Sequence, residues 1–208
     1  VPLLAAPFLA RMYSPEQFGA LGLLLAIANP VSIVVCGRYE LTVVLPREDQ
    51  QANLLARLGL GLAVCTTLVL GLAIIGLRDP LSTILGGPGT LVPLVAAPVL
   101  FGLMGFFQPL NNWLIRKQAF RAMGSNKLVQ TMGITLVSLV LGRWAADHGL
   151  ILGYLAGWAA YVAIGVLQAR RKGFRFRPVD VAAMREASRV HRDFPLYNTL
   201  PALLHTAT

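Results

Sequence analysis

The sequence predicts an all-α protein that crosses a membrane several times. Apolar residues make up 56% of its 208 residues and charged residues only 13%, against roughly 45–50% and about 25% in globular proteins. The mean hydropathy is +0.65. Uncharged runs also reach the roughly 20 residues that a helix needs to span the bilayer core. These observations predict a polytopic bundle of transmembrane helices.

Four uncharged runs are long enough to span, and a fifth is weaker. The four cover residues 18–37, 58–77, 80–115 and 149–169. The fifth, 128–142, reaches full length only if Lys127 and Arg143 extend to opposite interfaces. The apolar first and last stretches add two more helices, both incomplete. We therefore expect seven spans in a fragment of a longer protein.

Helix-capping and helix-breaking residues divide these runs. Ser14 to Gln17 has the form of a capping box with proline at the first helical position, and it starts the second span. That span is predicted to run to about Leu45, where Pro46 interrupts it. Asp79-Pro80 repeats the signal before a short helix that ends at Gly86 and Gly87, which we expect to lie on the membrane surface.

The basic residues predict the orientation. Fourteen of the 18 lysines and arginines fall on the side of the Pro46 loop, and only Arg11, Arg78 and Arg143 fall on the other. Loops rich in Lys and Arg stay in the cytoplasm. The sequence thus predicts a multi-pass membrane protein with its missing N-terminus in the cytoplasm.

The longest polar stretch, 170–193, has eight basic residues. After Pro178 its apolar residues recur at three-residue spacing, which predicts an amphipathic helix held on membrane lipids. Aromatic residues that could stack on bases are few, so no nucleic-acid partner is expected. The predicted organisation is a transmembrane lobe over 1–169, a cytoplasmic basic linker over 170–193, and the start of a seventh span over 194–208.

Arg38 and Glu40 are ionisable residues predicted inside the second span. A charge at membrane depth costs roughly 2.5–3.5 kcal/mol on insertion scales, so it usually faces a partner or a water-filled path. Two residues apart on a helix, the side chains point about 200° apart and cannot easily pair with each other. Each is therefore expected to need a partner from another helix or a ligand. The alternative is that both lie near the interface and extend to it.

A second polar group closes the fourth span. It comprises Gln108, Asn111, Asn112, Arg116 and Lys117. Amide side chains in a span commonly join helices. Gathered near Arg38, Tyr39 and Glu40, the same groups could bind sugar hydroxyls and a phosphate. These eight residues form the candidate binding site.

The sequence carries no enzyme signature. Its three histidines have no metal-ligand spacing and no partner for a nucleophile, so neither catalytic residues nor a metal is expected. Cys36 and Cys65 stand in apolar runs and are interpreted as small buried residues. The glycines of the third span, 59, 61, 71 and 76, do not form a phosphate loop and are interpreted as points of close helix contact.

Several motifs, taken in order, resemble a known family. They are residues 13–19 (YSPEQFG), 37–41 (GRYEL) followed by 44–46 (VLP), 113–120 (WLIRKQAF) and 192–197 (RDFPLY). In this order they are similar to bacterial polysaccharide biosynthesis proteins of the oligosaccharide flippase (O-antigen translocase) type. That type belongs to the multidrug/oligosaccharidyl-lipid/polysaccharide exporter superfamily.

The resemblance implies a transporter of two six-helix lobes around a central cavity. It would flip a polyprenyl-diphosphate-linked oligosaccharide, a lipopolysaccharide precursor for example, from the cytoplasmic to the periplasmic leaflet of the cell inner (plasma) membrane by alternating access. No cofactor is implied beyond a coupling ion, proton or sodium, for which Glu40 is the candidate. Membrane lipids and a glycan polymerase or ligase are the expected partners. A multidrug exporter of the same superfamily and a polytopic enzyme of glycan assembly remain as alternatives.

Overall fold

The computed structural model describes residues 2–144 and 147–176, and these residues form helices and turns without a strand. The long helices are α1 (Pro2–Met12), α2 (Pro15–Val34), α3 (Asp49–Gly76), α5 (Leu91–Arg116), α6 (Phe120–Trp144) and α7 (Gly149–Arg171). Shorter elements are the 3-10 helices η1 (Tyr39–Val44) and η2 (Pro88–Thr90) and the helix α4 (Arg78–Ile84). The all-α prediction is confirmed.

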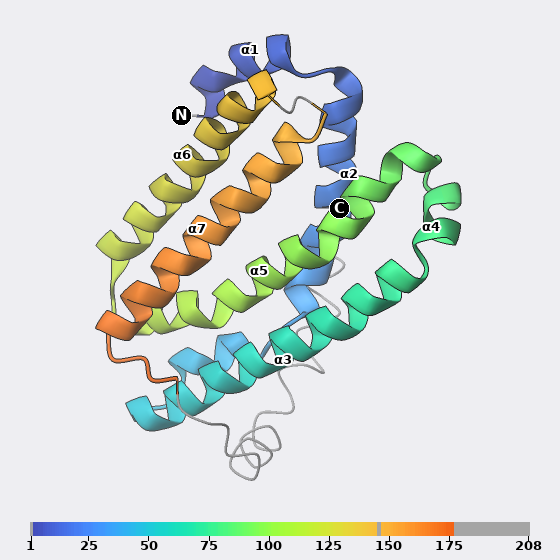
Figure 1. Ribbon diagram of the computed structural model, residues 1–208. Coiled ribbons are helices and arrows are strands. Elements are labelled where there is room, and N and C mark those ends of the chain that lie inside the picture. The colour runs from blue at the N-terminus through green and yellow to red at the C-terminus, as the bar shows by residue number, and fades with distance from the viewer. Residues whose placement is uncertain (1, 145–146, 177–208) are drawn as a thin grey trace.

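The long helices form a bundle in which α3 runs antiparallel to α5 and α6 runs antiparallel to α7, whereas α2 and α7 run in the same direction as α5 (Figure 1). α6 and α7 pack along their length, as do α3 and α5, and α5 also contacts α2 and α7. α5 therefore lies at the centre. At one end of the bundle, the end of α5 lies near η1 and the start of α3, and the start of α6 and the end of α7 lie at the same end.

The start of α2 follows the sequence prediction, but its end does not. The backbone N–H of Ser14 donates to Gln17 Oε1 at 2.8 Å, as a capping box requires. The helix ends at Val34 instead of near Leu45. Gly37 and Arg38 have φ of +57° and +60°, a left-handed conformation that an α-helix cannot contain. The chain then continues as η1, so residues 39–44 are not part of the span.

Glycines set the distance between α6 and α7. A Cβ on Gly153 would lie 2.9 Å from the backbone nitrogen of Ser138, and one on Gly157 would lie 2.8 Å from that of Ile134. The two backbones are therefore in direct contact, because small residues allow helices to approach this closely.

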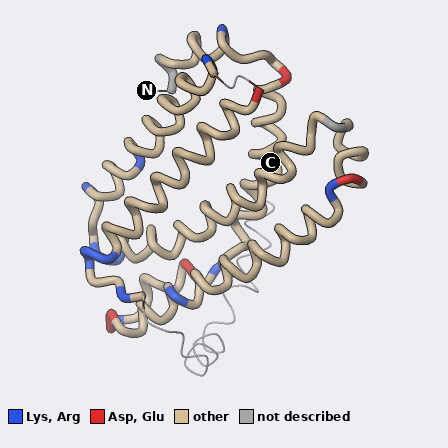
Figure 2. The backbone as a smooth tube through the Cα atoms, in the orientation of Figure 1, with Lys and Arg blue, Asp and Glu red and all other residues tan. Residues whose placement is uncertain are grey.

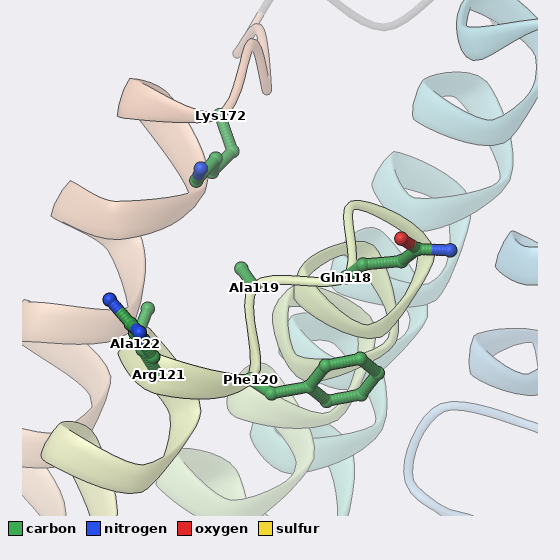
Figure 3. Close-up of a pocket in the computed structure, with 6 residues that line it drawn as sticks. All are labelled: Gln118, Ala119, Phe120, Arg121, Ala122 and Lys172. Carbon is green, nitrogen blue, oxygen red and sulfur yellow. The ribbon is translucent and has the colours of Figure 1, made fainter.

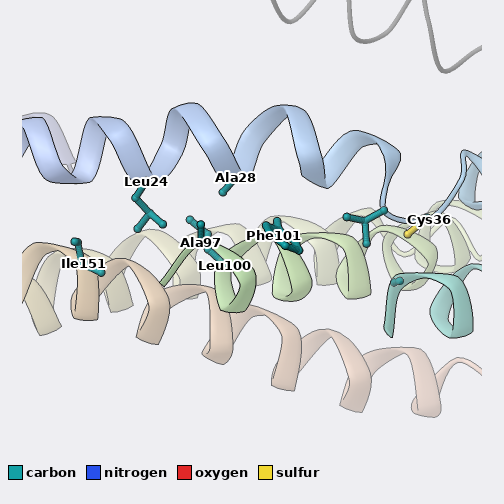
Figure 4. Close-up of a cluster of buried hydrophobic side chains, with 9 residues drawn as sticks. Leu24, Ala28, Cys36, Ala97, Leu100, Phe101 and Ile151 are labelled. Carbon is teal, nitrogen blue, oxygen red and sulfur yellow. The ribbon is translucent and has the colours of Figure 1, made fainter. Parts of the chain in front are cut away.

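A first core cluster joins α2, α5 and α7 (Figure 4). Leu24 and Ala28 of α2 face Leu100 and Phe101 of α5, and all four are fully buried. Ile151 extends the cluster to α7.

A second cluster joins α3, α5 and the segment after α7 at the other end of these helices. Trp113 and Phe174 meet edge to face, with ring centroids 5.4 Å apart. The amide of Asn53, in the orientation that its hydrogen bonds require, donates to the Arg175 carbonyl at 3.1 Å and accepts from the Arg175 N–H at 3.0 Å. The chain leaving α7 is thereby attached to the first turns of α3.

Four helices are long and apolar enough to cross a membrane: α2, α3, α5 and α7. Their outward faces remain apolar, as shown by Val69 and Leu72 of α3, which are 66% and 70% exposed. An apolar exterior of this extent suits lipid, since soluble proteins rarely expose large apolar patches. α6 is long enough but less apolar and is not among these four, in keeping with the weaker run at 128–142.

Most Lys and Arg of the described residues gather at one end (Figure 2). We call this the basic end; the elements that meet there carry Arg47, Arg116, Lys117, Arg121, Lys127, Arg170, Arg171, Lys172 and Arg175. Arg11 at the end of α1, Arg78 at the start of α4 and Arg143 at the end of α6 belong to the opposite end. The uneven distribution inferred from the sequence is therefore present in space.

Some packing predictions hold and others are wrong. Gly59 and Gly71 do face close neighbours, with Pro109 and Pro98 at 3.0 and 3.1 Å from a Cβ placed there, whereas Gly61 and Gly76 have nothing within 4 Å.

The two cysteines also differ, because Cys36 is buried but Cys65 is exposed. Cys65 lies on a face of α3 that points away from the bundle, so an apolar context did not imply burial. The short helix expected after Asp79 is present as α4. The predicted amphipathic helix and the seventh span lie outside the described residues.

Candidate functional site

Arg38 and Glu40 form an ion pair at the break after α2. Arg38 Nη1 lies 3.5 Å from Glu40 Oε1. The expectation that the two could not pair is wrong, because it assumed an unbroken helix. With Arg38 left-handed and Glu40 in η1, the two side chains fold back toward each other.

This pair is buried and poorly matched. Glu40 is 2% exposed, and the Arg38 side chain 19%. Among the described residues neither carboxylate oxygen of Glu40 receives a hydrogen bond, and Arg38 Nε has no acceptor. η1 lies outside the four membrane-length helices. Burial raises the pKa of the Glu40 carboxyl, and the backbone amide of Glu40 and the nearby Arg38 offset this rise only in part. The pair thus has unused hydrogen-bonding capacity.

The backbone of η1 is held closely between α3 and α5. A Cβ on Gly59 would lie 3.0 Å from Pro109 and 3.8 Å from the backbone nitrogen of Glu40. Gly59 therefore leaves the space in which η1 and α5 meet α3. Beside it, the Cys36 thiol donates to the Gly105 carbonyl at 3.0 Å.

The amides of α5 are partly committed to packing. Gln108 Nε2 donates to the Ser32 carbonyl at 2.7 Å and so satisfies an acceptor in the last turn of α2. Asn112 Nδ2 donates to the Gln108 carbonyl at 3.1 Å within its own helix. Asn111 is half-buried and has no hydrogen-bond partner among the described residues. Of the three, Asn111 has its whole hydrogen-bonding capacity available.

Arg116 and Lys117 hold the loop that enters α3. Arg116 Nε donates to Asp49 Oδ1 at 3.1 Å, and its two terminal nitrogens donate to the carbonyls of Pro46 and Arg47. Lys117 Nζ bonds the other Asp49 oxygen and lies 5.2 Å from the centre of the Trp113 ring. Both cations are therefore occupied, and Asp49 partly neutralises them.

The eight predicted residues lie along one stretch of α5 and the segments packed on it, but in separate groups. Arg38 and Glu40 pair with each other, and Tyr39 begins η1 beside them. Arg116 and Lys117 meet Asp49 instead.

Two participants were missed from the sequence. One is Asp49, whose place after Pro46 in a run of charged residues was the available signal. The other is the Ser32 carbonyl, which gives no sequence signal because the end of α2 was misplaced. Over the described ranges, no group of three His, Cys, Asp or Glu side chains could hold a metal ion.

Comparison with known proteins gives two matches. Residues 8–188 match the polysaccharide biosynthesis protein family. The chain is also 25% identical over 170 residues to the succinoglycan biosynthesis transport protein ExoT of Rhizobium meliloti (strain 1021), which covers 76% of this chain and 33% of that protein. The chain thus spans about one third of the length of that relative, and no solved structure matches it. By the extent of the family match, the chain belongs to the polysaccharide biosynthesis protein family.

Proposed function

We propose that the chain forms one lobe of a transporter that flips a polyprenyl-diphosphate-linked oligosaccharide from the cytoplasmic to the periplasmic leaflet of the inner membrane. Family membership supports the polysaccharide class. The relative from R. meliloti is named as a transport protein, which favours transport over catalysis. The activity belongs to the whole transporter, to which this chain contributes one lobe.

The observation that carries the proposal is the buried pair of Arg38 and Glu40. An ion pair with unmet donors and acceptors is a costly arrangement in a protein interior. A diphosphate would give the Arg38 guanidinium the two-point acceptor that Glu40, at 3.5 Å, does not supply. In this proposal the substrate phosphate and Glu40 compete for Arg38.

A coupling ion would control that competition. A proton added to a Glu40 oxygen neutralises the carboxylate and weakens its attraction for Arg38, which then becomes available to the substrate. Sodium bound by the carboxylate would act in the same way. No other cofactor is proposed.

The remaining candidate residues take supporting roles. Arg116 and Lys117 add positive potential at the basic end even while they hold Asp49. Tyr39, Asn111 and the amides of Gln108 and Asn112 contact sugars or hold α2 and α5 together. The excess of Lys and Arg supports a cytoplasmic position for the basic end, where the substrate and glycan polymerase or ligase partners would meet it.

Glycan export in cells that carry the whole transporter tests the proposal. We expect Arg38→Ala to abolish surface polysaccharide while lipid-linked oligosaccharide accumulates inside, and Arg38→Lys to retain part of the export because the charge remains. The matched control is Arg171→Ala, an exposed arginine of the basic end. All variants should reach the membrane in equal amounts.

The alternative functions, a multidrug exporter or a glycan polymerase or ligase, predict different results. Normal export by Arg38→Ala would remove Arg38 from the mechanism. A multidrug exporter would alter drug resistance and leave glycan export unchanged when the gene is deleted. A polymerase or ligase would convert lipid-linked glycan in a purified system without any vesicle interior.

A further inference from the structure

An open pocket of about 580 Å³ lies at the basic end, between the first turn of α6 and the end of α7. It is lined by Gln118, Ala119, Phe120, Arg121, Ala122 and Lys172. Figure 3 shows the Lys172 side chain reaching from α7 toward the turn that carries Arg121 and Ala122. Two helices therefore each contribute one cation to the pocket.

These two cations are not neutralised. Within residues 2–144 and 147–176, neither the Arg121 nor the Lys172 side chain has an ion-pair or hydrogen-bond partner. The first turn of α6 contains no acidic residue. The pocket differs in this respect from Arg116 and Lys117, which share Asp49.

The backbone at the start of α6 adds N–H donors, which carry partial positive charge like the two cations. The amide of Met123 is the first in α6 to bond back by four residues, to the Ala119 carbonyl at 3.1 Å. The N–H groups of residues 120–122 come before it, and the methyl group of Ala119 cannot cap them. Free amides and the positive end of the helix dipole therefore face the residues of the pocket, an arrangement that favours an anion.

Two amides one helical turn from the pocket lining carry buried polar atoms without a partner among the described residues. Asn126 lies one turn below Ala122 on the same face of α6, is 0% exposed, and has no partner for Nδ2 or Oδ1 among the described residues. On α7, Gln168 stands one turn before Lys172, and its Oε1 is also buried and unmatched. Unsatisfied buried polar groups call for a hydrogen-bonding partner.

We propose that this pocket binds a phosphate group, carried by an anionic phospholipid headgroup or free in solution. The Arg121 guanidinium offers a planar fork to two phosphate oxygens, Lys172 a point charge, and the first turn of α6 its amides. Phe120, 64% exposed at the rim, offers an apolar contact to the glycerol and acyl carbons of a lipid. The pocket shares no residue with the Arg38–Glu40 pair, so it stands or falls independently of the proposed function.

Native mass spectrometry of the full chain in a neutral detergent tests the site. The probes are dihexanoyl phosphatidylglycerol, dihexanoyl phosphatidylcholine and inorganic phosphate. We expect one phosphatidylglycerol to bind about tenfold more tightly than phosphatidylcholine, and Arg121→Gln/Lys172→Gln to remove this preference. Ala122→Leu should also weaken binding, because it keeps every charge but fills the floor of the pocket.

The matched control, Arg47→Gln/Arg171→Gln, removes two exposed charges from the same end outside the pocket. It should change the affinity less than about twofold. Equal weakening by the control, equal binding of phosphatidylcholine, or unchanged binding by Ala122→Leu would overturn the site in favour of a diffuse basic surface. Displacement of the lipid by millimolar phosphate would identify the phosphate group itself as the ligand, and failure to displace would identify the lipid headgroup.

Discussion

The hydroxyl of Tyr13 donates to the carbonyl of Ser138 at 2.6 Å, joining the turn between α1 and α2 to α6. Tyr13 is 4% exposed, and Gly142 and Gly149 make room for its ring: a Cβ on Gly149 would lie 2.2 Å from the hydroxyl. The ring therefore occupies a space that only glycines on α6 and α7 leave open.

Substitution of Tyr13 should destabilise the bundle in two steps. We expect Tyr13→Phe to lower the free energy of unfolding by about 1 kcal/mol through the lost hydrogen bond, and Tyr13→Ala by about 3–5 kcal/mol through the cavity left behind. Thermal unfolding in detergent measures both. Phe8→Ala on α1 is the control, because Phe8 is 63% exposed and should matter little; equal losses for Phe8→Ala and Tyr13→Ala would contradict the packing described.

Alanine at Gly153 or Gly157 should separate α6 from α7. The added methyl group would meet backbone nitrogens of α6 at 2.9 and 2.8 Å, so the backbone itself must move. We expect a loss of about 1–3 kcal/mol for each substitution, as for other overpacked sites. Gly61→Ala and Gly76→Ala serve as controls in open surroundings and should stabilise α3 slightly. Denaturant unfolding distinguishes the two outcomes by sign.

Arg116→Gln should loosen the loop before α3 more than Asp49→Asn. Arg116 holds two backbone carbonyls in addition to the carboxylate, whereas Asp49 is 57% exposed and its ion pairs are screened by solvent. Amide hydrogen exchange of residues 47–50 should accelerate several-fold in Arg116→Gln and only slightly in Asp49→Asn. The order would be reversed if the carboxylate, and not the carbonyls, fixed the loop.

The two cysteines should differ in reactivity. Burial raises the pKa of the Cys36 thiol well above its ordinary value, so little thiolate forms at neutral pH, and the thiol donates to the Gly105 carbonyl. Cys65 is exposed. In detergent a small apolar maleimide should label the parent once, Cys36→Ser equally, and Cys65→Ser only after unfolding. Labelling of folded Cys65→Ser at the parental rate would show that the break after α2 is open.

Glu40→Gln should uncouple transport from the ion gradient in the whole transporter. Burial raises the pKa of Glu40, so the carboxyl takes up a proton at a higher pH than an exposed glutamate, and acidification weakens its pair with Arg38. We expect flipping to respond to a proton gradient in the parent and to lose that response in Glu40→Gln. The Glu48→Gln control removes an exposed carboxylate nearby. Transport that ignores both proton and sodium gradients in parent and variant alike would contradict this role.

The sequence predicted the helices better than the contacts between them. Composition and uncharged runs are local properties, and they located α2, α3, α5 and α7; the signal at Ser14 located the start of α2 within one residue. The end of α2 was misplaced because Pro46 is a visible breaker, whereas a left-handed Arg38 is not typical of a non-glycine residue. That single error also produced the wrong conclusion about Arg38 and Glu40.

The candidate site shows the same limit. Residue type identified Arg116 and Lys117 as cations near a membrane face, but their engagement with Asp49 depends on how α3 and α5 pack. Likewise, nothing local distinguishes the outward-facing Cys65 from the buried Cys36. Such contacts between segments far apart in sequence become visible only once the helices are placed in space.

The double hydrogen bond between Asn53 and the Arg175 backbone has a mechanical consequence. Together with the Arg116–Asp49 contact it fastens three helix ends, those of α3, α5 and α7, into one unit. The opposite ends of α3 and α5 lie farther from this unit, and among the described residues no hydrogen bond joins those two ends. Any rocking of the bundle should therefore pivot at the basic end, with the largest excursions near α4, because Tyr13 packs on Gly149 at the start of α7.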